Sequence, residues 1–162
     1  MAEIKTKRGD VILVDDEDFE FAANYNWNVG SGGYARRNKR RGDPEHEGAT
    51  ILLHRQLMGL AYGDAGIVDH INGNRLDNRR ANLRLCNRSE NTRNQKKRST
   101  NTSGYKGVCF HKGCQKWGAT IHYGGRQRHI GMFDTPELAY AAYCDAARRH
   151  HGEFANVGIE CQ

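Results

Sequence analysis

The apolar residues of this chain occur in short runs, and this constrains its fold more than any other feature. Only 37% of the 162 residues are hydrophobic, and no apolar run approaches the roughly 18 residues that a membrane-spanning helix needs. Runs such as residues 11–14 and 51–53 are bounded by Gly, Asn and charged residues, a pattern typical of short strands and small helices. The sequence therefore predicts small cores, in one ordinary domain or two small ones, and extended contact with a large partner.

Charge is distributed unevenly along the chain. Residues 1–50 hold 8 Lys or Arg and 10 Asp or Glu, a net charge of −2. Residues 51–100 hold 10 and 4, a net charge of +6, and residues 101–162 hold 7 and 5, a net charge of +2. Such a concentrated basic segment favours a polyanionic partner, because Lys and Arg bind phosphates and release counterions. The alternative is a solvated basic face without a partner.

The coarse pattern of secondary structure indicates an α+β protein. Residues 1–50 resemble short strands and turns, with GSGG as a hairpin turn, and ATILLHRQLMG predicts a strand leading into a short helix. The helix ends near Gly59 or Gly63, and His54 within it is expected to be structural. Residues 67–97 predict a strand, a turn-rich loop, a second strand and a helix capped by Ser89.

The run VDHINGNRLDNRRANLRLCNRSENTRNQ holds the residues best suited to chemistry. Asp69 offers a hard anionic oxygen that suits Mg²⁺, and Asn91 can add a neutral carbonyl oxygen. His70 has a side chain that takes a proton from water near neutral pH. Asn82 can fix the ring of His70 by bonding to the imidazole or to the backbone. The set predicts metal-assisted phosphodiester hydrolysis.

The same phrase carries a resemblance to a known family. It resembles the HNH nuclease motif, and in particular the phage and intron-encoded HNH homing endonucleases, whose His-Asn-His/Asn pattern matches His70, Asn82 and Asn91. The upstream stretches YNWNVGSGGYARR and LLHRQLMG resemble what precedes the motif in these proteins, so the match covers about residues 10–97. Asn91 stands in place of the last His, a swap that many homing members share.

The resemblance implies a ββα-metal fold and a role for each matching residue. His70 would be the general base, Asp69 and Asn91 the metal ligands, and Asn82 the residue that orients the base. Asn91 in place of His argues for Mg²⁺ or Mn²⁺ as the cofactor and against zinc. A separate zinc site is not expected, because the chain has no CxxC and Cys109 and Cys114 are the only close cysteine pair.

Residues 105–157 predict a separate unit of three strands and one helix. YKGVCFH, KWGATIHY and RQRHIGMF have alternating patterns, and a helix follows from Pro136 to about residue 150, capped by Asp134 or Thr135 and ended by Gly152. YKGV, KWGATI, HIGMFDTPELAYAAYCDAA and G-FAN resemble the Apetala-type (ethylene-response-factor) DNA-binding domain. The resemblance implies a three-stranded sheet that lies in the major groove and is backed by the helix.

Together these features predict a site-directed DNA endonuclease of two modules. Residues 1–66 form a strand-rich region, 67–97 the ββα-metal HNH core, 98–104 a linker and 105–157 the Apetala-type domain. We expect double-stranded DNA as the partner, a monomer that nicks or a homodimer that cuts both strands, and a cytoplasmic location in a bacterial or phage-infected cell without membrane contact. The residues expected to contact DNA are Arg75, Arg79, Arg80, Arg84, Arg88, Arg93, Lys96, Lys97, Lys106, His111, Lys116, Thr120, His122, Arg126 and Arg128.

Two other functions fit part of the sequence. A DNA-binding regulator with an inactive HNH core would keep the basic residues and the C-terminal unit, and activity with Mg²⁺ distinguishes it from an enzyme. An RNA-binding protein would fit the charge, but it leaves the phrase around Asp69 and His70 unexplained.

Overall fold

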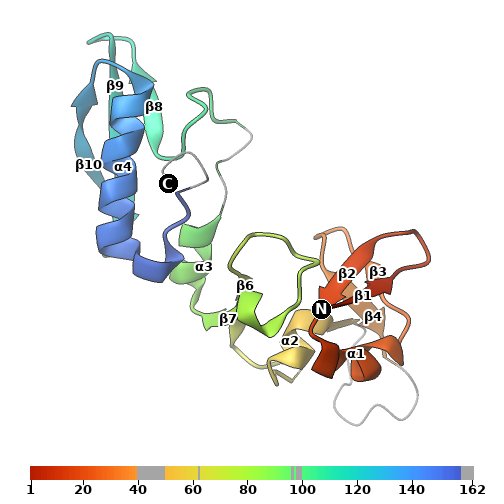
Figure 1. Cartoon of the computed structure of the whole chain (residues 1–162). Helices are drawn as coiled ribbons and strands as arrows, with labels where there is room; N and C mark the ends of the chain where they lie inside the picture. The colour runs from red at the N-terminus through yellow and green to blue at the C-terminus, as the bar shows by residue number, and fades with distance from the viewer. Residues whose placement is uncertain (40–49, 62, 96, 98–99, 158–162) are drawn as a thin grey trace. The chain divides into compact units, whose positions relative to one another are not determined.

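The computed structural model describes residues 1–39, 50–61, 63–95, 97 and 100–157 (Figure 1). The chain divides into two compact units, Met1–Asn91 and Thr92–Gln162. The division falls inside the helix α3 (Arg88–Asn94), so this helix contributes residues to both units. Residues 98 and 99 of the expected linker, and the expected DNA contact Lys96, lie outside the described residues.

The chain begins with a hairpin and a helix. Strands β1 (Ala2–Lys5) and β2 (Val11–Val14) pair antiparallel, and helix α1 (Asp16–Ala23) follows. The sequence pattern predicted only strands and turns in residues 1–50, so α1 is a correction. The first turn of α1 holds three acidic side chains, which interact favourably with the positive end of the helix dipole.

The next elements agree with the predicted order. Strands β3 (Asn28–Val29) and β4 (Ala35–Asn38) form the expected Gly-rich hairpin, and β5 (Thr50–Leu52) pairs with β4. Helix α2 (Leu53–Leu57) continues directly from β5. Gly59, just after this helix, has a φ of 71°, a conformation that glycine adopts without steric cost.

Strands β6 (Ile67–His70) and β7 (Leu83–Cys86) pair antiparallel, with Asp69 opposite Arg84 and His70 opposite Leu83. The turn η1 (Arg80–Asn82) leads into β7, and α3 follows it. The strand, loop, strand and helix predicted for this segment are therefore present. Leu85 is 54% exposed although Leu83 is buried, so the half-buried pattern predicted for this strand holds only at Leu83.

The core of this unit is small. Ile12, Val14 and Leu53 are fully buried, and they pack with residues from the helices and the hairpins. Trp27 is fixed in the same core by a 2.8 Å hydrogen bond from its Nε1 to the carbonyl oxygen of Ala22. The other core members are Ala22, Ala35, Leu57, Val68 and Leu83.

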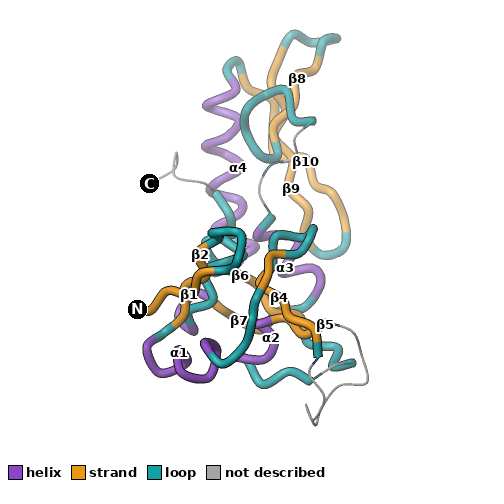
Figure 2. The backbone as a smooth tube through the Cα atoms, turned by 90° about the vertical axis from the view of Figure 1, so that its right-hand side faces the viewer, coloured by secondary structure: helices purple, strands orange, loops and turns teal. Residues whose placement is uncertain are grey.

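The second unit is a three-stranded antiparallel sheet backed by one helix (Figure 2). Its strands are β8 (Val108–His111), β9 (Lys116–Tyr123) and β10 (Arg126–Phe133), with β9 in the centre. Helix α4 (Pro136–His151) packs on the sheet, and the turn η2 (Gly152–Phe154) follows it. The predicted strands and helix are confirmed here.

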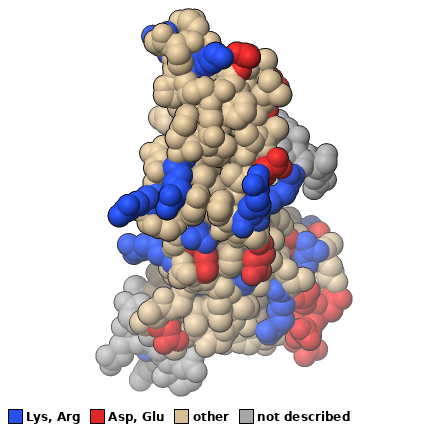
Figure 3. All heavy atoms as spheres, turned by 90° about the vertical axis from the view of Figure 1, so that its left-hand side faces the viewer, with Lys and Arg blue, Asp and Glu red and all other residues tan. Residues whose placement is uncertain are grey.

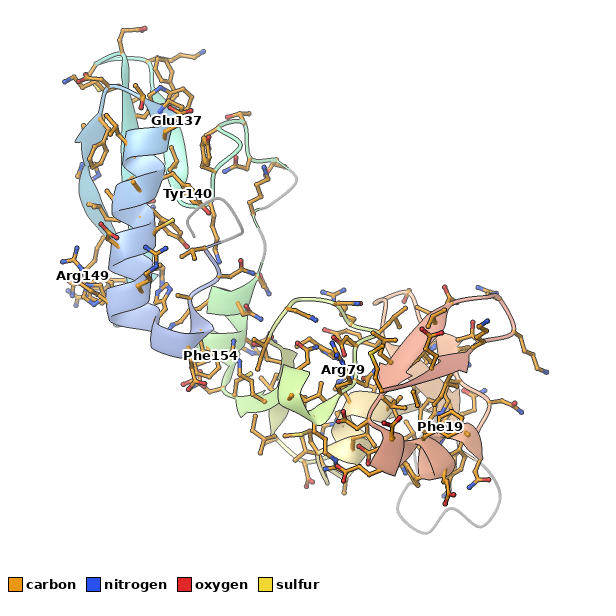
Figure 4. The ribbon with its side chains drawn as sticks, viewed as in Figure 1. Phe19, Arg79, Glu137, Tyr140, Arg149 and Phe154 are labelled. Carbon is orange, nitrogen blue, oxygen red and sulfur yellow. The ribbon has the colours of Figure 1, made fainter. Side chains whose placement is uncertain are left out.

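The ends of α4 are where the sequence placed them. The Oγ1 of Thr135 accepts a 3.3 Å hydrogen bond from the backbone N–H of Leu138, and Gly152 follows the last turn. Glu137, Tyr140 and Arg149 lie along this helix (Figure 4). Among the described residues, no helix is both long enough and apolar enough to cross a bilayer.

Candidate functional site

Asp69 and His70 lie at the end of β6, and both are buried, with exposures of 6% and 4%. The Oδ2 of Asp69 accepts hydrogen bonds from Nε and Nη2 of Arg84, at 3.1 and 2.8 Å. Arg84 lies opposite Asp69 in the register of β6 and β7. The sheet therefore positions an anionic oxygen next to a histidine, with a guanidinium holding the carboxylate.

His70 is surrounded by rings and one amide. Its Nε2 lies 3.5 Å from Oδ1 of Asn78, a long contact. Its ring centroid lies 5.1 Å from that of His54, edge to face, and 5.9 Å from that of Tyr34. Burial lowers the pKa of His70 below 6.5 and outweighs Asn78 and Asp69, which raise it. The imidazole is therefore neutral near pH 7 and able to accept a proton.

His54, on helix α2, lies next to the ring of His70. It is 5% exposed, and its Nδ1 is buried without a hydrogen-bond partner among the described residues. Burial, and next the proximity of His70, lower the pKa of His54 to about 3. The sequence indicated a structural role for this histidine, and the structure adds a direct ring contact with His70.

Tyr34 and Arg75 close one side of this ring cluster. The ring of Tyr34 lies 4.9 Å from His54, and the guanidinium carbon of Arg75 lies 4.8 Å from the centroid of Tyr34. The Nη1 of Arg75 also donates a 2.6 Å hydrogen bond to the carbonyl oxygen of Gly32. The sequence had no signal for Tyr34, because it lies 36 positions before His70.

Asn82 fixes the loop between the two strands. Its Oδ1 accepts from the backbone N–H of Asn72 at 2.9 Å, and its Nδ2 donates to the carbonyl oxygen of Asp77 at 2.7 Å. The side chain of Asn72 in turn donates to Asp77 at 2.8 Å. Of the two contacts considered for Asn82, imidazole or backbone, these bonds are with the backbone. They fix the loop that follows His70.

The loop is also anchored to β2. The backbone N–H of Leu13 donates to the carbonyl oxygen of Leu76, and the backbone N–H of Asn78 donates to the carbonyl oxygen of Leu13. Asp77 and Asn78 are 1% and 0% exposed. Sequence reasoning placed them in a turn and missed their roles as buried supports. Their only signal was the Asp-Asn pair within LDNR, a composition common to turns.

Asn91 lies on α3 near the end of β7. The helix begins with a reciprocal cap in which Asn87 Oδ1 accepts from Glu90 N–H, and Glu90 Oε2 accepts from Asn87 N–H, at 3.0 and 2.8 Å. Asn87 rather than Ser89 therefore caps the helix, because the acidic partner lies three residues after Asn87. Burial, Asp69 and Glu90 raise the pKa of the Cys86 thiol, and a hydrogen bond with the Asn91 backbone lowers it.

Cys86 therefore lies within electrostatic reach of Asp69 and within hydrogen-bonding reach of the Asn91 backbone. One carboxylate and one amide oxygen suit Mg²⁺, which retains several waters and takes few protein ligands. The donors therefore fit a hard divalent cation better than zinc.

A second acidic group lies apart from His70. Among the described residues, Asp15, Glu17 and Asp18 bring three carboxylates within 4.8 Å of one another. Arg80 binds both oxygens of Asp18, at 2.9 and 2.7 Å. These carboxylates thus hold an arginine and fix α1 to the turn η1.

Several arginines expected to bind phosphate are engaged inside the protein. Arg79 binds both oxygens of Asp77 at 2.7 Å (Figure 4), Arg80 binds Asp18 and Arg84 binds Asp69. These ion pairs correct the expectation that all the arginines of residues 51–100 are available for phosphates. Arg88 is exposed, and Arg93 and Asn91 are half-buried on α3.

Lys97 and Lys106 also have partners in the second unit. The Nζ of Lys106 donates to the carbonyl oxygens of Arg93 and Gln95, both at 2.6 Å, and burial lowers its pKa to about 8. Lys97 donates to the carbonyl oxygen of Gly104 at 2.5 Å. Lys106 is thus a cap for the end of α3, because the last carbonyls of a helix lack partners within it.

The strand register assigns the expected DNA contacts of the sheet to two faces. Arg126 pairs with Tyr123 and Arg128 with Ile121, and cross-strand partners share a face. Both arginines are therefore on the side of the helix, and Arg128 lies 4.7 Å from the ring of Tyr123. This corrects their expected outward placement. The open face carries His111, Lys116, Thr120 and His122. Gln127 and His129 also lie on this face and were not predicted from the sequence.

Comparisons with known proteins agree with the central segment. The family model described as HNH endonuclease matches residues 52–93, which include His54 and all four residues expected to act. Protein 3.8 of Escherichia phage T7 is 38% identical over 88 residues, which are 54% of this chain and 72% of that protein. No solved structure gives a significant match. The chain belongs to the family of phage T7 Protein 3.8 and contains an HNH endonuclease domain at residues 52–93.

Proposed function

We propose that this protein is a metal-dependent DNA endonuclease that hydrolyses phosphodiester bonds, with one active centre for one strand. The observation that carries the proposal is the buried pair of Asp69 and His70 on one strand end, inside the segment that matches HNH endonucleases. A passive DNA-binding surface has no need of a neutral buried histidine beside a buried carboxylate, whereas a hydrolase uses both.

His70 acts as the general base. Because burial lowers its pKa, its ring is unprotonated at neutral pH and takes the proton of the attacking water. The lowered pKa also means that activity is retained as the pH falls from 7 towards 6.5. The rate declines only when the pH passes through the pKa of His70, where the ring becomes charged.

Asp69 and Asn91 would hold Mg²⁺ or Mn²⁺, which would stabilise negative charge on the leaving oxygen. Arg84 orients Asp69 through two hydrogen bonds to its Oδ2. Asn82 holds the loop after His70 through Asn72 and Asp77, and so positions the base. The products are a 5′-phosphate and a 3′-hydroxyl.

The C-terminal unit docks the enzyme on its DNA site, in the manner of the homing endonucleases that the sequence resembles. Its topology, three antiparallel strands and one covering helix, is the one that the Apetala-type resemblance implies. The open face offers Lys116 with Thr120, His122 and Gln127 as hydrogen-bonding groups. Strands with such side chains can contact base edges in the major groove.

A supercoiled-plasmid assay tests the proposal. The wild-type chain with Mg²⁺ or Mn²⁺ should convert the plasmid to open circles, and a chelator should stop the conversion. Linear product would indicate a homodimer. The Asn91→Ala variant should need a higher metal concentration, because it loses one oxygen ligand. A plasmid that stays supercoiled with every metal, while a gel shift persists, would make the protein a DNA-binding regulator.

A further inference from the structure

A basic groove lies in the first unit, apart from the catalytic residues. It has a volume of about 470 Å³ and runs between the turn that joins β1 to β2 and the strands β3 and β4. Four of its lining residues are the cations Lys7, Arg8, Arg37 and Lys39, and none of those lining it among the described residues is acidic. Residues 1–50 therefore form a strongly basic local surface although their net charge is −2.

A cluster of acidic residues lies elsewhere in this unit. Asp15, Glu17 and Asp18 gather at the start of α1, where Arg80 binds Asp18 and Asp15. Figure 3 draws one face of the molecule, which carries both basic and acidic side chains. The Oδ2 of Asp10 accepts a 3.0 Å hydrogen bond from Oγ1 of Thr6, but no carboxylate lines the groove among the described residues. A groove lined by four cations attracts anions.

The floor and one wall of the groove are fixed before any ligand binds. Arg37 is 3% exposed, and its guanidinium carbon lies 3.8 Å from the ring centroid of Tyr25 and 5.7 Å from that of Trp27. The Oγ1 of Thr6 accepts hydrogen bonds from the backbone N–H groups of Arg8 and Asp10, at 3.3 and 3.1 Å. These contacts stabilise the turn that carries Lys7 and Arg8.

Strand β4 connects this groove to the catalytic cluster. Tyr34, just before the strand, contacts His54 and His70, and Asn38 at its other end lines the groove. Val29 also lines the groove and pairs with Ala35, the first residue of β4, so the groove extends along this strand towards Tyr34.

We propose that the groove binds the phosphodiester backbone of the DNA substrate outside the catalytic cluster. The inference rests on the proposed nuclease function. Lys7, Arg8 and Lys39 form the exposed rim that contacts phosphates, and Arg37 supplies a positive floor. Asn26 and Asn28 on the same rim donate hydrogen bonds to phosphate or sugar oxygens, as such side chains commonly do at DNA backbones.

The test compares salt dependence of binding in matched variants of the full chain. The probe is a labelled random-sequence duplex, studied in chelator so that no cleavage occurs. Each phosphate contact contributes about 0.9 to the slope of log affinity against log salt. Lys7→Ala combined with Arg8→Ala should therefore reduce the slope by about 1.8 and weaken binding at low salt.

Two control variants make the result specific. Lys5→Ala removes an exposed cation of β1 that does not line the groove, and it should leave the slope unchanged. Lys7→Arg combined with Arg8→Lys keeps both charges and should retain the wild-type slope. An unchanged slope in the Lys7→Ala, Arg8→Ala variant, or an equal loss per charge in Lys5→Ala, would overturn the groove as a DNA site.

The two proposals fail in different ways. If the wild-type chain nicks plasmid but the groove variant keeps the wild-type slope, the groove proposal is wrong and the nuclease stands. If the groove variant loses slope but the wild-type chain nicks nothing with any metal, the groove remains a DNA contact and the nuclease proposal is wrong.

Discussion

Two buried histidine rings meet at the candidate site, and the proximity of His70 helps to lower the pKa of His54. His54 and His70 are 5.1 Å apart between centroids, and both are at most 5% exposed. Burial removes the water that would solvate an imidazolium, and a second imidazolium nearby would repel it. His54 therefore packs against His70 as a neutral ring.

This pair makes the folded state sensitive to acid. The pKa of His54 is about 3 in the folded protein, and its ordinary value is 6.5. Between these two pH values the unfolded chain therefore binds a proton at His54 that the folded chain does not bind. Its stabilising effect is present above pH 6.5 and is lost as the pH falls towards 3. Between pH 6.5 and 5 the loss amounts to about 2 kcal/mol.

His54→Phe should reduce this acid sensitivity, because phenylalanine keeps an aromatic ring without a titrating nitrogen. Urea unfolding at pH 7 and pH 5 measures the effect as the change in free energy of unfolding between the two pH values. We expect a smaller change in the variant than in the wild type. Equal changes in the two proteins would show that His54 titrates normally in the folded state.

Sequence reasoning proposed reacting residues but missed their surroundings. Asp69, His70, Asn82 and Asn91 were predicted because they lie in one phrase of about 25 residues, and the family comparison covers that phrase. Tyr34, the ring contact of His54, Asp77 and Asn78 were missed. Their contacts join segments far apart in sequence, and such contacts are set by tertiary packing, which a local pattern does not reveal.

At the scale of elements, the site depends on a loop rather than on a helix. The loop from Ile71 to Arg79 follows the proposed base directly, and side chains hold it in shape. Asn72, Asp77 and Asn82 bond to one another and to backbone groups within it, and β2 adds two backbone bonds. A fixed loop helps to keep the His70 ring in one place.

Asn82→Ala should destabilise the protein, because it removes partners from the backbone N–H of Asn72 and the carbonyl oxygen of Asp77. A buried polar group left without a partner costs about 1–3 kcal/mol. Asn74→Ala is the matched control, since Asn74 is exposed and bonds only within its own turn, to the backbone N–H of Leu76. Urea unfolding should show a clearly larger loss for Asn82→Ala, and similar losses would contradict the support role.

Strong periodic patterns allowed most elements to be predicted. The bounds of β9 and β10 and the cap of α4 agree with the sequence, because alternating residues, Gly-Gly turns and Thr-Pro at a helix start are strong local signals. Helix α1 was missed, because DEDFEFAA is too charged and too short to show a clear helical face. The faces of β10 were misassigned, since the pairing register sets them.

For the whole molecule, we propose that DNA contact is divided between surfaces of the two units. The first unit holds the proposed active centre and the basic groove, and the second holds the sheet. Few permanent cations lie on the open face of the sheet, and Lys116 there is within 3.2 Å of Asp134. We therefore expect the sheet to contribute specificity through hydrogen bonds, while phosphate binding by the first unit contributes most of the affinity.

Two neighbouring substitutions on β10 test which face of the sheet meets DNA. Gln127→Glu and Arg126→Gln each lower the net charge by one, but Gln127 faces the open side and Arg126 the helix side. The full chain carrying Gln127→Glu should bind its DNA site more weakly than the chain carrying Arg126→Gln. The reverse order in a gel-shift titration would place the DNA on the other side.

The role of His70 as general base is tested by the nicking rates of the wild type and the His70→Ala variant on supercoiled plasmid with Mg²⁺. DNA affinity is measured separately in chelator. Loss of a general base typically lowers a rate by about 10²–10⁴-fold, and His70 is too buried to be a main DNA contact. We predict that the wild type nicks the plasmid and that the nicking rate of the variant is lower by about 10²–10⁴-fold. The two proteins should have nearly equal DNA affinity. Undiminished nicking by His70→Ala, or equal losses of cleavage and binding, would contradict the role of His70.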